Sequence, residues 1–145
     1  MMRLRALTVG IVFAVALPAS NAEGEGTEPV LGKGNLAPYA IGWRTAHPAV
    51  LSNGGVPSGR AWNLRWSNWG GGSATARGLT WLYRPSGGYY SKPGAIELRA
   101  YRLGQCVAGG PPAYTRLVVR VAIRPGGPLG RWYAWGGWRS TCRIG

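Results

Sequence analysis

Two runs of alternating apolar residues, joined by three consecutive glycines, constrain the fold of this chain more than any other feature. In the first run, Trp62, Leu64 and Trp66 alternate with polar residues, and beyond the glycines the alternation resumes at Leu79. A period of two places alternate side chains on one face of a β-strand. A Gly-rich connection between two such runs is typical of a hairpin. We therefore predict a β-hairpin over residues 60–84, with Trp62 and Trp66 in the core.

The rest of the chain adds short strands that are separated by turns. The clearest covers residues 114–124, where β-branched residues alternate with arginines ahead of a Pro-Gly-Gly-Pro turn. Shorter apolar or alternating runs lie at residues 39–43, 49–51, 96–101, 131–135 and 138–143. With no helical run beside them, these segments predict one all-β domain over residues 39–145. We expect a small antiparallel sandwich or barrel of about six to eight short strands.

The N-terminal residues indicate export. A short positive segment precedes the apolar residues 6–17, and small residues follow at Ser20 and Ala22. This order is that of a secretory signal peptide, and the apolar run is short for the alternative, an uncleaved membrane anchor. We therefore predict a signal peptide at residues 1–22, a flexible acidic leader at residues 23–38, and a location outside the cell or in the cell envelope.

The inventory of acids and bases disfavours an enzyme. The formal net charge is +13, and it falls to +11 when Arg3 and Arg5 leave with the signal peptide. Outside the acidic leader the chain has one carboxylate, Glu97, and its sole histidine is His47. A two-carboxylate glycosidase and a Ser-His-Asp triad both need more acids than this, and a metal site needs three or four clustered ligands. The sequence predicts a non-catalytic protein that binds no cofactor and no metal.

Cys106 and Cys142 are the only cysteines. Disulfides form and persist in exported proteins, so we predict one Cys106–Cys142 bridge. Closing a loop of this length stabilises a fold by about 4 kcal/mol in the chain-entropy model.

Arginines provide the first candidate binding surface. Arg116, Arg120 and Arg124 recur at every fourth residue of one predicted strand, about 13 Å apart on a single face. Arg99 lies on the strand before it. The guanidinium fork suits phosphate and carboxylate, and so strong a positive charge favours adsorption to polyanions. The alternative is the solvated outer face of a half-buried sheet.

Tryptophans provide the second candidate surface. Trp69 adjoins the glycine loop, and Trp132, Trp135 and Trp138 recur at every third residue. In an extended helix with three residues per turn the last three would lie on one side, whereas in strands they would divide between two faces. Such rings either stack on sugars or bases or close one end of the β-domain.

The runs LRWSNWGGGSATARGLTW, ELRAYRLGQC and AYTRLVVRVAIRP resemble a group of small exported actinobacterial proteins. The shared pattern is Leu-Trp-Ser-x-Trp-Gly, then Ala-Thr-x-x-Gly, a cysteine, and a Tyr-Thr/Ser-Arg-Leu strand. In this chain it falls on residues 64–70 (with Arg65 inserted), residues 74–78, Cys106 and residues 114–117.

This resemblance spans roughly residues 47–124. Many members of the group carry an additional cysteine where this chain has Ser52, so any bridge made there is absent. The resemblance implies export and β-structure, and it brings no activity with it.

Two functions fit the sequence. The first is a secreted, non-catalytic module that holds an anionic polymer or a glycan of the cell envelope through arginine and tryptophan. The alternative is a secreted effector that acts on membrane surfaces or on another protein. Nucleic-acid binding would fit the charge and the aromatic residues, but export argues against that partner. The sequence specifies no oligomeric state.

Overall fold

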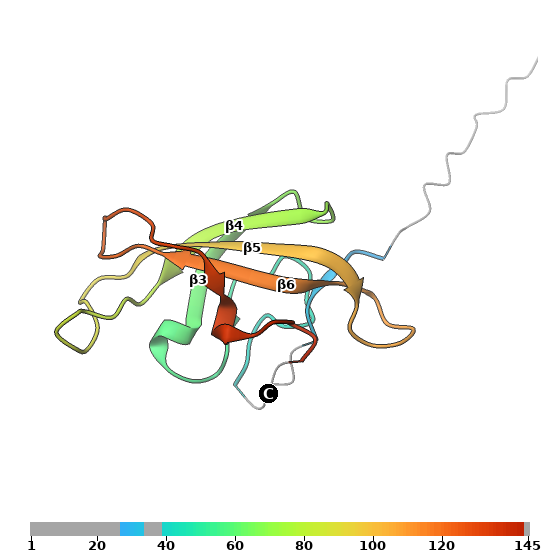
Figure 1. Cartoon of the computed structure of the whole chain (residues 1–145), viewed down its shortest axis with the longest axis horizontal. Helices are drawn as coiled ribbons and strands as arrows, with labels where there is room; N and C mark the ends of the chain where they lie inside the picture. Colours follow the sequence, from blue (N-terminus) through green and yellow to red (C-terminus); the bar gives the residue numbers. More distant parts are fainter. Residues whose placement is uncertain (1–26, 34–38, 144–145) are drawn as a thin grey trace, which may run out of the picture.

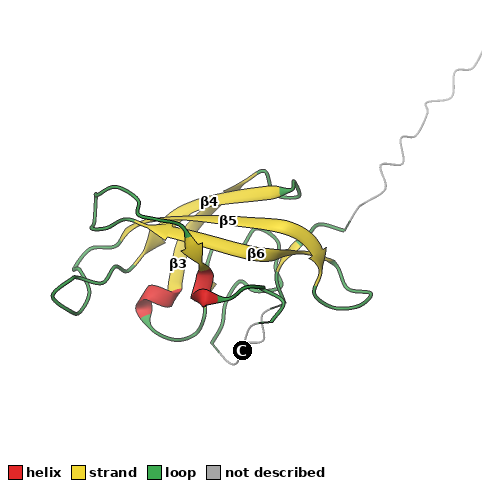
Figure 2. Cartoon of the chain, viewed as in Figure 1, coloured by secondary structure: helices red, strands yellow, loops and turns green. Residues whose placement is uncertain are grey.

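Seven strands make one curled, mixed β-sheet in the computed structural model, which describes residues 27–33 and 39–143 (Figure 1). The sheet order is β1-β6-β5-β4-β3-β2, and β7 pairs with β6. The strands are β1 (Val30–Leu31), β2 (Leu51–Ser52), β3 (Arg60–Ser67), β4 (Ser73–Thr80), β5 (Gly94–Gln105), β6 (Pro112–Val121) and β7 (Tyr133–Ala134). Two single turns of 3-10 helix, η1 (Pro57–Gly59) and η2 (Trp135–Gly137), lie beside the sheet (Figure 2). The predicted all-β fold is confirmed.

A segment of irregular backbone joins the two edges of this sheet. Ile41 exchanges two backbone hydrogen bonds of 3.0 Å with Ser52 of β2. A few residues later, Arg44 donates its N–H to Leu31 of β1, and Leu31 donates to Thr45, both at 2.9 Å. Of the two predicted architectures, the curled sheet is therefore closer to a barrel.

The segment ahead of residue 34 is part of the sheet. Strand β1 pairs in parallel with β6, Leu31 is fully buried, and Gly32 donates its N–H to the Tyr114 carbonyl at 3.1 Å. The prediction of a flexible leader is therefore wrong for residues 27–33. Two apolar residues are too few to show a period, and contacts with distant residues of β6 and with residues 44–45 order them. The remainder of the leader and the predicted signal peptide lie outside the described residues.

The predicted hairpin is present as β3 and β4, but a β-bulge interrupts it. The register shifts by one residue just after Trp62, and Asn63 has a φ of 52°, a left-handed conformation that asparagine tolerates. Because a bulge changes which residues share a face, Ala61 and Leu64 are both buried. Trp62 is absent from the buried cluster and contacts Trp81 instead, with ring centroids 5.7 Å apart. The prediction that Trp62 belongs to the core is wrong.

Residues of the tryptophan–glycine pattern hold the hairpin loop against β6. Tyr114 is fully buried; its hydroxyl donates to the Gly71 carbonyl at 2.6 Å and accepts the Gly70 N–H at 2.9 Å. Trp69 packs edge-on against the Tyr114 ring with centroids 5.0 Å apart, and Trp66 packs against Trp69 at 4.8 Å. Packing and loop anchoring therefore account for these positions.

Gly78, the last residue of the Ala-Thr-x-x-Gly pattern, faces the bulge. A Cβ at this position would lie only 2.5 Å from the Trp62 carbonyl oxygen. Two strands therefore approach each other here at a distance that only glycine permits.

Replacing Tyr114 with phenylalanine is expected to lower the free energy of unfolding by about 2 kcal/mol, because two loop hydrogen bonds lose their partner. Burial raises the pKa of the Tyr114 hydroxyl above its ordinary value of about 10. The folded protein thus keeps a proton that the unfolded chain loses, so this contribution is full below about pH 10 and disappears as pH rises through the folded pKa.

Urea unfolding at neutral and alkaline pH measures both effects, with Tyr39→Phe as the control because the Tyr39 side chain is exposed. The alkaline loss of stability should be smaller in Tyr114→Phe than in the wild type. Equal stability of the two phenylalanine variants would contradict the anchoring role of the Tyr114 hydroxyl.

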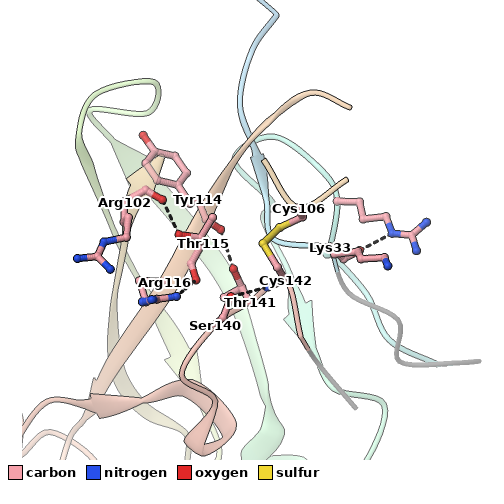
Figure 3. The surroundings of a disulfide bond; sticks show 10 residues. Lys33, Arg102, Cys106, Tyr114, Thr115, Arg116, Ser140, Thr141 and Cys142 are labelled. Atoms are coloured by element: carbon pink, nitrogen blue, oxygen red, sulfur yellow. Dashed lines mark hydrogen bonds between the residues drawn. A yellow bond between two sulfur atoms is a disulfide. The ribbon is translucent and has the colours of Figure 1, made fainter. Parts of the chain in front are cut away.

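The predicted Cys106–Cys142 disulfide is confirmed and joins the C-terminal segment to the end of β5 (Figure 3). The preceding residue, Thr141, is buried and donates its hydroxyl to the Tyr114 carbonyl at 2.7 Å. The Thr141 carbonyl accepts the Lys33 N–H at 3.0 Å. The C-terminal segment therefore lies between β6 and the residues that follow β1.

Two observations bear on the compartment. A disulfide is typical of proteins in an oxidising environment outside the cytoplasm. Within residues 27–33 and 39–143, no helix has the length and apolar character needed to cross a membrane.

Candidate functional site: an arginine face on the sheet

The outward side of strands β3 to β6 carries arginines around a single carboxylate. Alternate residues of β5, such as Leu98, are buried in the core, so the residues between them point outward. The strand register places Arg77 of β4 opposite Glu97 of β5, and Glu97 opposite Arg120 of β6. We define the arginine face as Arg65, Arg77, Arg99, Arg116 and Arg120, grouped around Glu97.

Glu97 contacts two of these arginines and orients Arg120 more firmly than Arg77. Its carboxylate accepts a hydrogen bond from Arg120 Nη2 at 3.1 Å and lies 3.6 Å from Arg77 Nε. The Glu97 side chain is 8% exposed, that of Arg120 32% and that of Arg77 80%. Arg77 therefore reaches into solvent, where its guanidinium remains free to bind an additional anion.

Trp132, which directly precedes β7, connects arginines of two strands. The Cζ atoms of Arg99 and Arg120 lie 4.9 Å and 4.6 Å from the centroid of its ring. A guanidinium in such a cation–π contact has its face against the ring, which leaves the N–H donors at its edge available. Trp132 therefore restrains two guanidiniums. The edge of Arg99 can still bind an anion, whereas Arg120 donates to Glu97 and its Nε is buried.

Arg124 does not belong to this face, contrary to the sequence prediction. Strand β6 ends at Val121, after which Ala122 is buried and Ile123 is exposed, the reverse of the predicted alternation. Arg124 begins a turn in which its carbonyl accepts the Gly127 N–H at 2.9 Å. The chain leaves the ladder three residues earlier than the period-two pattern predicts, so Arg124 lies in a loop.

Three of the four candidate tryptophans are used for packing. Trp135 is 4% exposed and donates its indole N–H to Asn53 Oδ1 at 2.8 Å. Trp138 and Trp69 are partly buried against the core, and Trp69 donates its N–H to the Pro29 carbonyl at 2.9 Å. Of the two predicted arrangements, the tryptophans of residues 132–138 therefore divide between faces. Of these four, Trp132 alone accompanies the arginines.

Sequence reasoning missed Arg65 and Arg77, and it left Glu97 without a role. The signal is present in β4, where Ala74 and Ala76 are buried and Thr75 and Arg77 alternate with them on the outward side. Because these inward side chains are so small, the alternation in β4 is hard to recognise from the sequence.

The sole histidine has an acid partner that sequence reasoning also missed. His47 Nε2 lies 2.9 Å from Glu28 Oε1, and both side chains are 56% exposed. The His47 ring also packs edge-on against Trp69, with centroids 6.0 Å apart. Glu28 comes from the segment that was predicted to be a leader, so its proximity depends on the pairing of β1 with β6.

Within the described part of the chain, no group of three His, Cys, Asp or Glu residues is placed to hold a metal ion. No protein-family model, curated protein or solved structure matches this chain. The resemblance to small exported actinobacterial proteins therefore stays a prediction.

Proposed function

We propose that this protein is an exported, non-catalytic binding module whose arginine face holds an anionic polymer of the cell envelope. The observation that carries the proposal is the arginine face itself. Five guanidiniums from four neighbouring strands share one side of the sheet with a single carboxylate, and two of them pack on Trp132. The net charge, +13 for the full chain and +11 without residues 1–22, acts in the same direction.

The spacing of the arginines suits a repeating ligand better than a single ion. Arg116 and Arg120 lie about 13 Å apart along β6. Arg77 and Arg99 add positive charge on β4 and β5, and neighbouring strands of a sheet are about 5 Å apart. A polymer with regularly repeated phosphates or carboxylates reaches several of these groups at once. Each further contact is then intramolecular, which raises the overall affinity well above that of one ion pair.

Cosedimentation of the purified protein with cell-wall sacculi tests this function. We expect the protein to bind sacculi that retain their anionic polymers, to dissociate as salt is raised, and to bind poorly once the polymers are extracted. The variant Arg77→Gln/Arg99→Gln/Arg116→Gln should bind about tenfold more weakly or worse, because three charge-assisted contacts are removed.

A second triple variant provides a control with the same net charge. Arg60, Arg84 and Arg124 are exposed and lie outside the arginine face, so their joint replacement by glutamine should weaken binding far less. Equal losses in the two triple variants would mean that net charge alone drives binding. Binding that resists salt, or that persists after polymer extraction, would overturn the proposal.

Glu97→Gln is expected to have opposite effects on stability and on binding. The Arg120 hydrogen bond loses its charged acceptor, so the free energy of unfolding should fall by about 2 kcal/mol. The face also loses its one negative charge, so polymer binding should strengthen severalfold. Urea unfolding and cosedimentation measure the two effects, with Glu28→Gln as a control that changes net charge equally. Binding no tighter than that of Glu28→Gln would argue against the arginine face.

A further inference from the structure

A pocket opens on the other side of the sheet from the arginine face. Its volume is about 520 Å³, within the range of small-molecule sites. Its floor includes the inward side chains of Ile96 and Val119, which are otherwise buried. Its rim includes Val56, Ile123 and Tyr133, whose side chains are 58%, 55% and 51% exposed. The pocket therefore reaches down to core residues at this end of the sheet.

The lining of this pocket is uncharged, although the chain as a whole carries +13. Aliphatic and aromatic side chains dominate it, among them Trp81 and Trp135. Exposed apolar residues that occur singly are ordinary, but several gathered around one hollow mark a place where an apolar group binds. The part of a ligand that enters must therefore be apolar and without charge.

Positive charges lie next to this uncharged pocket. A neighbouring hollow of about 390 Å³ has Val56 and Trp81 in common with it, and Arg60 is part of that hollow's lining. Arg84 and Arg124 are exposed, and each directly follows a residue of the pocket. Figure 1 shows the loops that contain them (residues 84–92 and 123–131) extending beyond the strands at the same end of the sheet. An apolar pocket beside cations is complementary to an anionic amphiphile.

We propose that this pocket binds a free single-chain amphiphile with an anionic head group. The alkyl chain enters over Ile96 and Val119, and the carboxylate or phosphate lies at Arg60, with Arg84 and Arg124 adding positive potential. A concave pocket of this size accepts one chain taken up as a monomer, whereas a bilayer surface would need a flat or protruding apolar patch. This site is separate from the arginine face and does not depend on the function proposed for it.

Titration with octanoate, decanoate and dodecanoate, each below its critical micelle concentration, tests the proposal. Trp81 and Trp135 line the pocket, so tryptophan fluorescence should report binding, and calorimetry gives the affinity independently. We expect affinity to rise about fourfold for each methylene that is buried, and the alcohol of equal length to bind more weakly than the carboxylate. Affinity independent of chain length would overturn the proposal, as would binding to anionic vesicles without binding of any monomer.

Variants at exposed positions locate the site without disturbing the core. Val56→Asn/Ile123→Asn should weaken binding of every chain length severalfold, and Arg60→Gln should abolish the preference for carboxylate over alcohol. Circular dichroism confirms the fold of each variant. Wild-type affinity in the double variant would place the ligand elsewhere, and an unchanged preference in Arg60→Gln would overturn the head-group assignment.

The Arg77→Gln/Arg99→Gln/Arg116→Gln variant is the control for independence from the arginine face. It should retain dodecanoate binding at wild-type affinity even if it loses the polymer. A parallel loss of dodecanoate binding would overturn the assignment of the amphiphile to the pocket.

Discussion

Removal of the disulfide by Cys106→Ser/Cys142→Ser is expected to lower the free energy of unfolding by about 4 kcal/mol. The bridge joins residues separated by 36 positions, so without it the unfolded chain gains the conformational freedom of a long open loop. The folded C-terminal segment should keep its place at first, because Thr141 is hydrogen-bonded to Tyr114 and Lys33 independently of the sulfur atoms.

Urea unfolding with and without a reducing agent measures this effect. The wild type should lose about 4 kcal/mol when it is reduced, and the double serine variant should not respond to the reductant. A variant within about 1 kcal/mol of the oxidised wild type would contradict the prediction, since a native disulfide in a small domain contributes more than this.

Leu98→Ala is expected to lower the free energy of unfolding by about 3 kcal/mol. Leu98 is a fully buried residue of the hydrophobic core. It lies on β5, which is paired with β4 on one side and with β6 on the other. Its truncation removes apolar contacts and leaves a cavity that the surrounding sheet fills only in part. Its neighbours Glu97 and Arg99 point to the opposite side, so polymer binding per folded molecule should be unchanged.

Leu103→Ala is the matched control, because Leu103 lies on the same strand and is 42% exposed. This variant should lose well under about 1 kcal/mol of unfolding free energy in the same urea experiment. Equal losses at Leu98 and Leu103 would contradict the placement of the core on the inward side of β5.

The place of a tryptophan in the sequence does not predict its role in the structure. The Trp-Ser-x-Trp-Gly run is conspicuous in the sequence as a candidate motif, yet Trp66, Trp69 and Gly70 all serve to anchor the hairpin loop to Tyr114. Trp132 has no feature in the sequence that separates it from Trp135, and only the structure shows that one packs on arginines while the other is buried.

The features that could be predicted from the sequence are local ones. Alternation with a period of two and turn-forming glycines predict strands and a hairpin, because both act over a few neighbouring residues. The disulfide was predicted because the chain has two cysteines and its sequence predicts export. These features were sufficient for the all-β fold and for the placement of Arg99, Arg116 and Arg120 on strands.

The strand register, and the point at which the chain leaves the sheet, are known only from the folded structure. One extra residue at Asn63 moves Trp62 out of the core, and the early end of β6 removes Arg124 from the arginine face. The Arg77–Glu97–Arg120 contacts join three strands. Strand β1 is ordered by its pairing with β6 and by its hydrogen bonds to Arg44 and Thr45. Such contacts form between residues far apart in the chain, whose alignment is set by the packing of the whole sheet and leaves no local period to read.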